Sequence, residues 1–158
     1  MVSSSMIRRL QDNDIEEIAK IWLETNIEAH SFIPKQYWIA NYDFVKTMLP
    51  KVEVYVYDDE DGIHGFVGLN GDHIEGVFVS KNMQCQGIGK SLLEYIKGER
   101  RRLTLNVNKK NVRALAFYLR EGFKTVIEGT DEDTREPDIL MEWRTSASGQ
   151  LTIVNKSS

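Results

Sequence analysis

The chain has 158 residues, of which 41% are hydrophobic and 28% are charged. This composition is typical of a globular protein and excludes a disordered or fibrous chain. The net charge of -4 argues against a general affinity for nucleic acids or anionic membranes, because both select basic surfaces. The sequence has one cysteine and no stretch typical of a signal peptide or a membrane span, so we expect a cytoplasmic protein without an internal disulfide.

The first part of the chain predicts a short strand and two helices. The strand is expected at Met6–Leu10, and Asp12 or Asp14 can cap the following helix, in which apolar residues recur at helical spacing. A second, aromatic-rich helix is expected from Gln36 to Leu49, because Pro50 cannot continue it. We expect its aromatic side chains to lie in the core.

Three strands are then expected to form an antiparallel meander. Valines alternate with other residues over Val52–Val56, and this period of two is typical of a strand. Turns are indicated at Asp58–Gly62 and Asn70–Gly71, since these residue types favour tight turns. The other two strands are expected at Ile63–Leu69 and Ile74–Val79.

The second half of the chain predicts two more helices and three strands. One helix carries its apolar face at Ile88, Leu92, Leu93 and Ile96. The remaining elements are a strand at Leu103–Val107, a helix at Val112–Glu121 ended by Gly122, and strands at Phe123–Glu128 and Ile139–Trp143. The order strand, loop, helix, strand implies one parallel crossover. We therefore predict a mixed α/β fold in a single domain over residues 6–144, with flexible or vector-derived ends at 1–5 and 145–158.

The segment Gln84–Lys90, QCQGIGK, lies between a predicted strand and the start of a predicted helix. Glycines let the backbone approach a phosphate closely, and the unpaired amides at a helix start carry partial positive charge. The segment has neither the GxxxxGK[ST] spacing of a Walker loop nor the GxGxxG spacing of a dinucleotide fingerprint. The sequence therefore predicts an anion site for a different kind of diphosphate.

The Q-x-x-G-x-G spacing resembles the acetyl-CoA loop of the GCN5-related N-acetyltransferase (GNAT) superfamily. A second block, Leu105–Asn111 followed by Phe117-Tyr118 and Glu121–Phe123, resembles the strand, asparagine and helix of the same family, in the same order. His30–Ile33 and Pro137-Asp138 are similar to a bacterial subgroup of small GNAT proteins, some of which act on protein lysines. The resemblance implies a GNAT fold with about six or seven strands and four helices. In this fold the antiparallel meander and the parallel crossover form one sheet, and the strand before the loop splays apart from the strand after the next helix.

In that family the pantetheine arm enters between the splayed strands and the pyrophosphate lies on the glycine loop. The resemblance implies acetyl-CoA as co-substrate and assigns its contacts to residues on the strand before the loop, the loop, the next strand and the last helix. These residues are Phe78, Val79, Gln84, Cys85, Gln86, Gly87, Ile88, Gly89, Lys90, Ser91, Asn106, Asn111, Phe117 and Tyr118.

Three residues are candidates for proton transfer. Tyr118 matches the tyrosine that the family places near the thioester sulfur as general acid, and an ordinary tyrosine is protonated at neutral pH. Glu75 and His30 are candidate bases for the amine. Each has an alternative interpretation: Tyr118 packs on the sheet, Glu75 is a solvated strand residue, and His30 is structural.

Other features favour no separate chemistry. The three histidines lack metal-ligand spacing, so we expect no metal. Cys85 is expected to be a neutral loop thiol rather than a nucleophile. The basic run Lys97–Arg102 is either a solvated helix end or a contact for RNA or the CoA 3'-phosphate. The acidic segments Asp58–Asp61 and Asp131–Asp138 are either turns or a means to attract a cationic acceptor.

The predicted function is transfer of an acetyl group from acetyl-CoA to a primary amine, by direct attack in a ternary complex. The acceptor is left open between a protein lysine or N-terminus and a small amine. The alternative is an acyl-CoA-binding regulatory module without turnover. The expected partners are acetyl-CoA and the acceptor, with no nucleic acid and no membrane, and the chain is expected to be a monomer or a homodimer.

Overall fold

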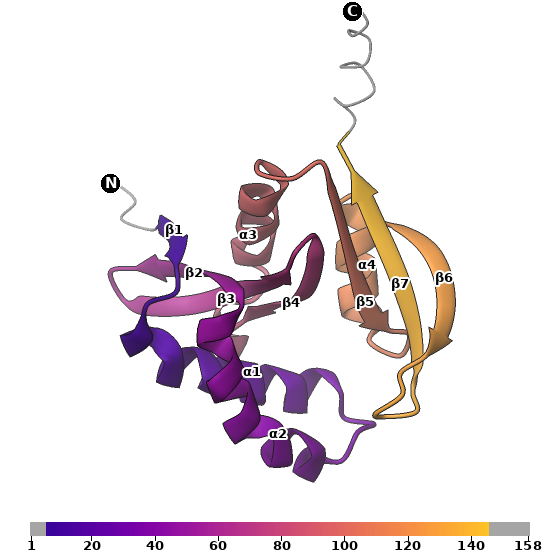
Figure 1. The fold of residues 1–158 in the computed structure, drawn as a ribbon, viewed down its shortest axis with the longest axis horizontal. Helices are drawn as coiled ribbons and strands as arrows, with labels where there is room; N and C mark the ends of the chain where they lie inside the picture. The colour runs from indigo at the N-terminus through magenta and orange to yellow at the C-terminus, as the bar shows by residue number, and fades with distance from the viewer. Residues whose placement is uncertain (1–5, 146–158) are drawn as a thin grey trace, which may run out of the picture. The chain divides into compact units, whose positions relative to one another are not determined.

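The computed structural model describes residues 6–145, so the predictions for residues 1–5 and for nearly all of 145–158 lie outside the described residues. Seven strands and four α-helices occur in this range (Figure 1), as predicted for a mixed α/β chain. The chain divides into two compact units with a boundary between Tyr95 and Ile96. The assignment of residues 6–144 to a single domain stays a prediction.

The first unit contains the predicted antiparallel meander. Its strands are β1 (Met6–Arg9), β2 (Glu53–Asp59), β3 (Gly62–Asn70) and β4 (His73–Val79), and they pair in the order β1-β2-β3-β4. Gly71 turns the chain between β3 and β4 with a φ of 64°, a conformation that glycine adopts without steric cost. The predicted hairpin turns are confirmed.

Two helices, α1 (Ile15–Ala29) and α2 (Lys35–Met48), complete the first unit. Ile18, Ala19 and Ile21 are almost fully buried in one core cluster with valines of β2. The helix α1 includes Asn26, whose buried side chain donates to the Trp22 carbonyl within the helix at 2.9 Å. Phe44, expected in the core, is 62% exposed on α2.

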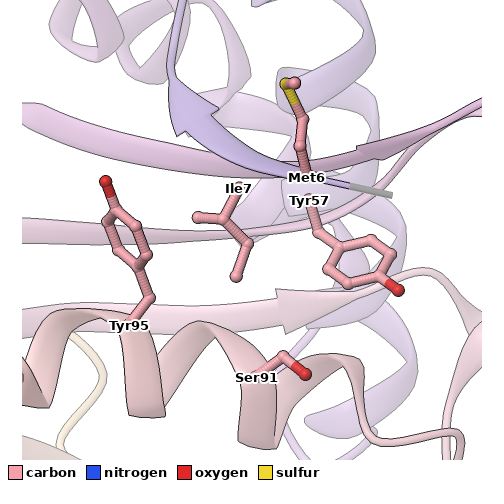
Figure 2. A pocket seen from close by; sticks show the side chains of 5 residues that line it. All are labelled: Met6, Ile7, Tyr57, Ser91 and Tyr95. Atoms are coloured by element: carbon pink, nitrogen blue, oxygen red, sulfur yellow. The ribbon is translucent and has the colours of Figure 1, made fainter. Parts of the chain in front are cut away.

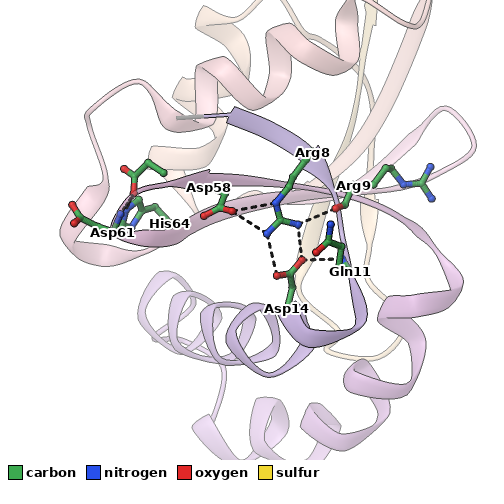
Figure 3. Close-up of polar contacts among 8 residues, drawn as sticks. Arg8, Arg9, Gln11, Asp14, Asp58, Asp61 and His64 are labelled. Carbon is green, nitrogen blue, oxygen red and sulfur yellow. Dashed lines mark hydrogen bonds and ion pairs between the residues drawn. The ribbon is translucent and has the colours of Figure 1, made fainter. Parts of the chain in front are cut away.

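Asp14 holds together three segments of the first unit rather than capping α1. It occupies the N-cap position but makes no side-chain cap bond. Its carboxylate instead accepts two hydrogen bonds from the Arg8 guanidinium, at 2.8 and 3.1 Å, and one from the Gln11 amide at 2.8 Å (Figure 3). The same guanidinium donates to Asp58 on β2 at 3.0 and 3.1 Å. The contacts join β1, β2 and the start of α1.

Replacing Asp14 by Asn is expected to lower the free energy of unfolding by about 2 kcal/mol at pH 7, because a nearly buried charged hydrogen-bond acceptor is lost. The Arg8 hydrogen bonds lower the pKa of Asp14 below its ordinary value of 3.8. The stabilisation is therefore complete above that value and is lost as the pH falls through the lower folded-state pKa. Urea unfolding at pH 7, 4 and 3 should show the gap between wild type and Asp14→Asn shrinking on acidification. A gap that is constant with pH would contradict this assignment.

The strands β5 (Arg102–Asn108), β7 (Pro137–Arg144) and β6 (Lys124–Thr130) of the second unit pair antiparallel in the order β5-β7-β6. The helix α4 (Val112–Arg120) is followed by Gly122, which has a φ of 98° and stops the helix, as predicted. The helix α3 (Ile88–Lys97) crosses the boundary between the units, and its predicted apolar face is buried.

Lys97, the last residue of α3, is bound inside the second unit. Its Nζ donates to the Glu121 carbonyl at 2.6 Å, just past the end of α4. The same Nζ lies 5.9 Å from the ring centroid of Phe123 and 5.3 Å from that of Trp143, within the range of cation–π contacts. This lysine of the basic run thus stabilises a helix end and two aromatic side chains.

Candidate functional site

The predicted anion loop is anchored to the strand before it. After β4 the chain makes a short 3-10 helix at Lys81–Met83. The Ser80 amide donates to the His64 carbonyl on β3 at 2.9 Å, and the Gln84 side chain donates to the Val79 carbonyl at 3.0 Å. Gln84, the first residue of the motif, thus fixes the loop to the end of β4.

The loop backbone then adopts two left-handed conformations, at Cys85 with a φ of 66° and at Gly87 with a φ of 84°. Such a φ is easy for glycine and costs energy at other residues. The Ser91 amide donates to the Gly87 carbonyl at 2.9 Å, which closes the first turn of α3. The amides ahead of Ser91 lie at a helix start, where partial positive charge favours an anion.

Side chains of the loop are expected to contribute less to the predicted anion site than its backbone. Lys90, predicted as an added cation, pairs with Glu94 at 3.6 Å, and both side chains are more than half exposed. Cys85 is exposed, as expected for a loop thiol. The Glu94 carboxylate already lies beside the Lys90 ammonium. The positive charge at the loop therefore comes mainly from the backbone amides at the start of α3.

The end of β4 is shaped by a glycine that sequence reasoning missed. A Cβ atom at Gly76 would lie 2.3 Å from the Phe78 ring, so any larger residue there would force that ring to move. The Phe78 ring stacks on Phe66 of β3 with a centroid distance of 4.8 Å. A glycine two residues before a phenylalanine in a strand is the signal for such a close approach. Glu75, on the same strand, is exposed.

His30 lies at the end of α1 among aromatic rings. Its ring centroid is 5.2 Å from that of Trp38 and 5.7 Å from that of Phe32. The Nδ1 atom is 3.2 Å from the Asn26 carbonyl, and a carbonyl can only accept, so Nδ1 carries the proton. Burial lowers the pKa of His30 below its ordinary value of 6.5. The neutral ring therefore keeps a lone pair on Nε2 near neutral pH.

Trp38 is one of the aromatic residues for which the sequence predicts a core position, and its indole also carries a polar group. Its ring forms an edge contact with Trp22 at a centroid distance of 5.8 Å and another with Tyr37 at 4.9 Å. Its Nε1 atom is buried without a hydrogen-bond partner. Aromatic residues at helical spacing usually signal a core, so no local pattern separates this indole from a packing residue.

Four predicted residues belong to the second unit. Asn111 caps α4: its side-chain oxygen accepts from the Ala114 amide at 3.3 Å. Tyr118 is the buried residue of α4, 7% exposed, with its ring 5.2 Å from Phe117 and 5.6 Å from Phe123, centroid to centroid. Asn106 is an exposed residue of β5. The capping role of Asn111 was missed, although asparagine before a helix is a recognisable signal.

The predicted site residues thus fall into two sets. The structure brings the end of β4 together with the loop and the first turn of α3 in the first unit. It brings Phe117 together with Tyr118 on α4 in the second unit. His30 lies with the aromatic rings of α1 and α2, and its described ring contacts include neither Glu75 nor the loop.

The first unit has two other features, a cluster of potential metal-ligand atoms and a surface groove. Asp59, Asp61 and His64 place one potential metal-ligand atom each within 4.8 Å of one another, and His64 Nε2 lies 2.8 Å from an Asp59 oxygen. A groove of about 290 Å³ has a lining that includes Ser91 and Tyr95 of α3 and residues of β1 and β2 (Figure 2). The expected absence of a metal stays a prediction.

Within residues 6–145, no helix combines the length and the apolar character needed to cross a membrane.

Comparison with known proteins gives one consistent answer. Residues 50–125 match the model of the acetyltransferase (GNAT) domain. The chain is 31% identical over 140 residues to the peptidyl-lysine N-acetyltransferase YiaC of Escherichia coli, covering 87% of this chain and 96% of YiaC. It is 30% identical to the peptidyl-lysine N-acetyltransferase YjaB of the same organism, covering 85% and 92%. The solution structure of apo-form YjaB matches with a TM-score of 0.80 and 29% identity, over 90% of this chain and 98% of that one.

Proposed function

This chain belongs to the acetyltransferase (GNAT) family, and we propose that it transfers the acetyl group of acetyl-CoA to lysine side chains of proteins. The observation that carries the proposal is the match to YiaC along nearly its whole length, since that relative is named a peptidyl-lysine N-acetyltransferase. YjaB, which carries the same name, supports it with similar identity and coverage. A cytoplasmic location and independence from metals are further predictions of this proposal.

The start of α3 is proposed as the pyrophosphate site. Gly87 directs the chain into the helix with a positive φ, and the amides between it and Ser91 belong to the helix start, where an anion gains most from the helix dipole. The Gln84 bond to the end of β4 keeps this loop beside the strand whose Phe78 and Val79 would contact the pantetheine arm. The loop residues Gln84 to Ser91 fit a diphosphate through backbone groups rather than through side-chain charge.

The proposed reaction needs two proton transfers. The neutral lysine amine attacks the thioester carbonyl, the tetrahedral intermediate collapses to an amide, and the carbon–sulfur bond breaks to give a CoA thiolate. Tyr118 is proposed to donate the proton that the thiolate takes up. Of the two candidate bases, His30 is favoured over Glu75, because burial lowers its pKa and its Nε2 lone pair is free at neutral pH. The rings of Trp38 and Phe32 beside it suit the apolar stem of a lysine.

The acceptor class is tested by measuring CoA thiol release from acetyl-CoA with three acceptors. These are a lysine-containing peptide with a blocked N-terminus, the same peptide with arginine in place of lysine, and spermidine. We expect release only with the lysine peptide, together with one added acetyl group by mass spectrometry.

Release with spermidine alone would overturn the protein-lysine proposal and leave the acetyltransferase assignment intact. Binding of acetyl-CoA by calorimetry, with no release for any amine, would favour the regulatory module instead.

A further inference from the structure

The Trp38 indole is a hydrogen-bond donor that lacks an acceptor. Its Nε1 atom is shielded from solvent and has no hydrogen-bond partner within residues 6–145. A buried indole N–H usually finds an acceptor, because an unpaired donor costs free energy that a phenylalanine at the same position would not. The nitrogen of Trp38 is therefore either incidental to packing or a donor whose acceptor arrives with a ligand.

The place of Trp38 in the first unit favours a ligand. No residue of α2 is fully buried, and Trp38 itself is only partly buried. The core cluster between α1 and β2 has Trp22, Tyr42 and Val45 packed against it, but not Trp38. The indole thus lies near the surface, and Ile39, the next residue, is 43% exposed. Small movements of side chains are enough to let an acceptor reach Nε1.

The ring beside Trp38 is that of His30, the proposed base. The two ring centroids are 5.2 Å apart and the ring planes differ by 31°. His30 offers a lone pair on Nε2, and Trp38 offers an N–H, so adjacent rings present one acceptor and one donor. A protein lysine matches both, because a flexible four-carbon stem separates its amine from main-chain carbonyls. A protonated polyamine has donors only.

We propose that the Trp38 N–H donates a hydrogen bond to a main-chain carbonyl of the acceptor, and that Trp38 thereby selects peptidyl lysines over simple amines. The inference rests on the proposed function and names a residue that determines its specificity. A peptide supplies the acceptor that the indole lacks, whereas an amine without a carbonyl leaves the donor unpaired. One such hydrogen bond is expected to favour the peptide about tenfold in kcat/KM.

The test compares two acceptors and one isosteric change. Nα-acetyl-lysine methylamide offers carbonyls, and pentylamine has the same amine and a similar stem without one. Replacing the Trp38 indole by benzothiophene puts sulfur where the N–H was and keeps the ring shape. This variant should raise the KM for the lysine compound about tenfold with little change in kcat, and kcat/KM for pentylamine should not change.

The same replacement at Trp22 is the matched control. Trp22 forms an edge contact with Trp38 at a centroid distance of 5.8 Å, but its nitrogen is not among the buried unpartnered atoms of the described residues. The benzothiophene ring at position 22 should leave the KM for both acceptors unchanged. A purely structural effect at position 38 would alter both acceptors alike.

An NMR measurement follows the Trp38 N–H directly. In the isotope-labelled full chain with CoA added, the indole cross-peak that is missing from Trp38→Phe belongs to Trp38. Saturating Nα-acetyl-lysine methylamide should move this cross-peak downfield, as expected for a new hydrogen bond, and pentylamine should leave it in place.

Two outcomes would overturn the inference and leave acetyl transfer to lysine intact. One is a wild-type KM for the lysine compound in the benzothiophene variant, and the other is an indole cross-peak that the lysine compound does not move. If neither compound nor the lysine peptide is acetylated, the proposed function fails instead. The response of the Trp38 cross-peak to the lysine compound then decides by itself whether Trp38 binds a carbonyl.

Discussion

Replacing Gly87 by Val is expected to lower the affinity for acetyl-CoA by at least about a hundredfold. Gly87 has a φ of 84°, and a β-branched residue held in this region pays roughly 1–3 kcal/mol in backbone strain. If the loop instead relaxes, the amides at the start of α3 turn away from the pyrophosphate, and each lost hydrogen bond to a charged group costs about 1.5–3 kcal/mol. Isothermal titration calorimetry with acetyl-CoA measures the change directly.

Gly71 provides a matched control. It also has a positive φ, 64°, in the turn between β3 and β4, and neither glycine has an atom within 4 Å of where a Cβ would be built. Gly71→Val should therefore carry a similar backbone penalty and lower stability, with the affinity for acetyl-CoA unchanged. If both variants lost affinity equally, the effect would be general destabilisation and the assignment of the pyrophosphate to this loop would fail.

Replacing Tyr118 by Phe is expected to lower kcat about a hundredfold, near the lower limit for removal of a general acid. The affinity for acetyl-CoA should not change, because phenylalanine keeps the ring that packs between Phe117 and Phe123. Single-turnover acetylation of the lysine peptide, with the affinity determined separately, distinguishes a loss in chemistry from a loss in binding.

The competing interpretation is that Tyr118 only packs in the second unit, where it is 7% exposed. Tyr95→Phe is the control, since it removes a hydroxyl from a tyrosine of α3 that is 37% exposed and has no proposed catalytic role. A Tyr118→Phe variant with the kcat of this control would exclude the general-acid role. The thermal midpoint of both variants should stay near that of wild type.

Local patterns predicted the elements of the fold well. The burial of Leu92, Leu93 and Ile96 on α3 follows from their helical spacing, and the end of α4 follows from Gly122. These features depend on residues a few positions apart, whose geometry the backbone period fixes. The anion loop was found for the same reason, since Gln84 to Gly89 is a continuous segment.

Contacts between distant residues were not predicted. Asp12 or Asp14 was expected to cap α1, but the Asp14 carboxylate binds Arg8, whose guanidinium also reaches Asp58, 50 residues further along the chain. No local pattern predicts that partner. The ion pair with Arg8 stabilises the Asp14 carboxylate more than a cap hydrogen bond would.

The left-handed φ of Cys85 was also not predicted, because non-glycine residues rarely adopt it.

The position of Lys97 has a consequence for a protein whose family acetylates amines. An amine attacks a thioester through its lone pair, which is unavailable in the ammonium form that cation–π contacts require. The Lys97 Nζ donates to the Glu121 carbonyl and faces the Phe123 and Trp143 rings, and acetylation would remove the positive charge on which the two ring contacts depend. Acetylation of Lys97 is therefore expected to weaken the contacts that stabilise the end of α4.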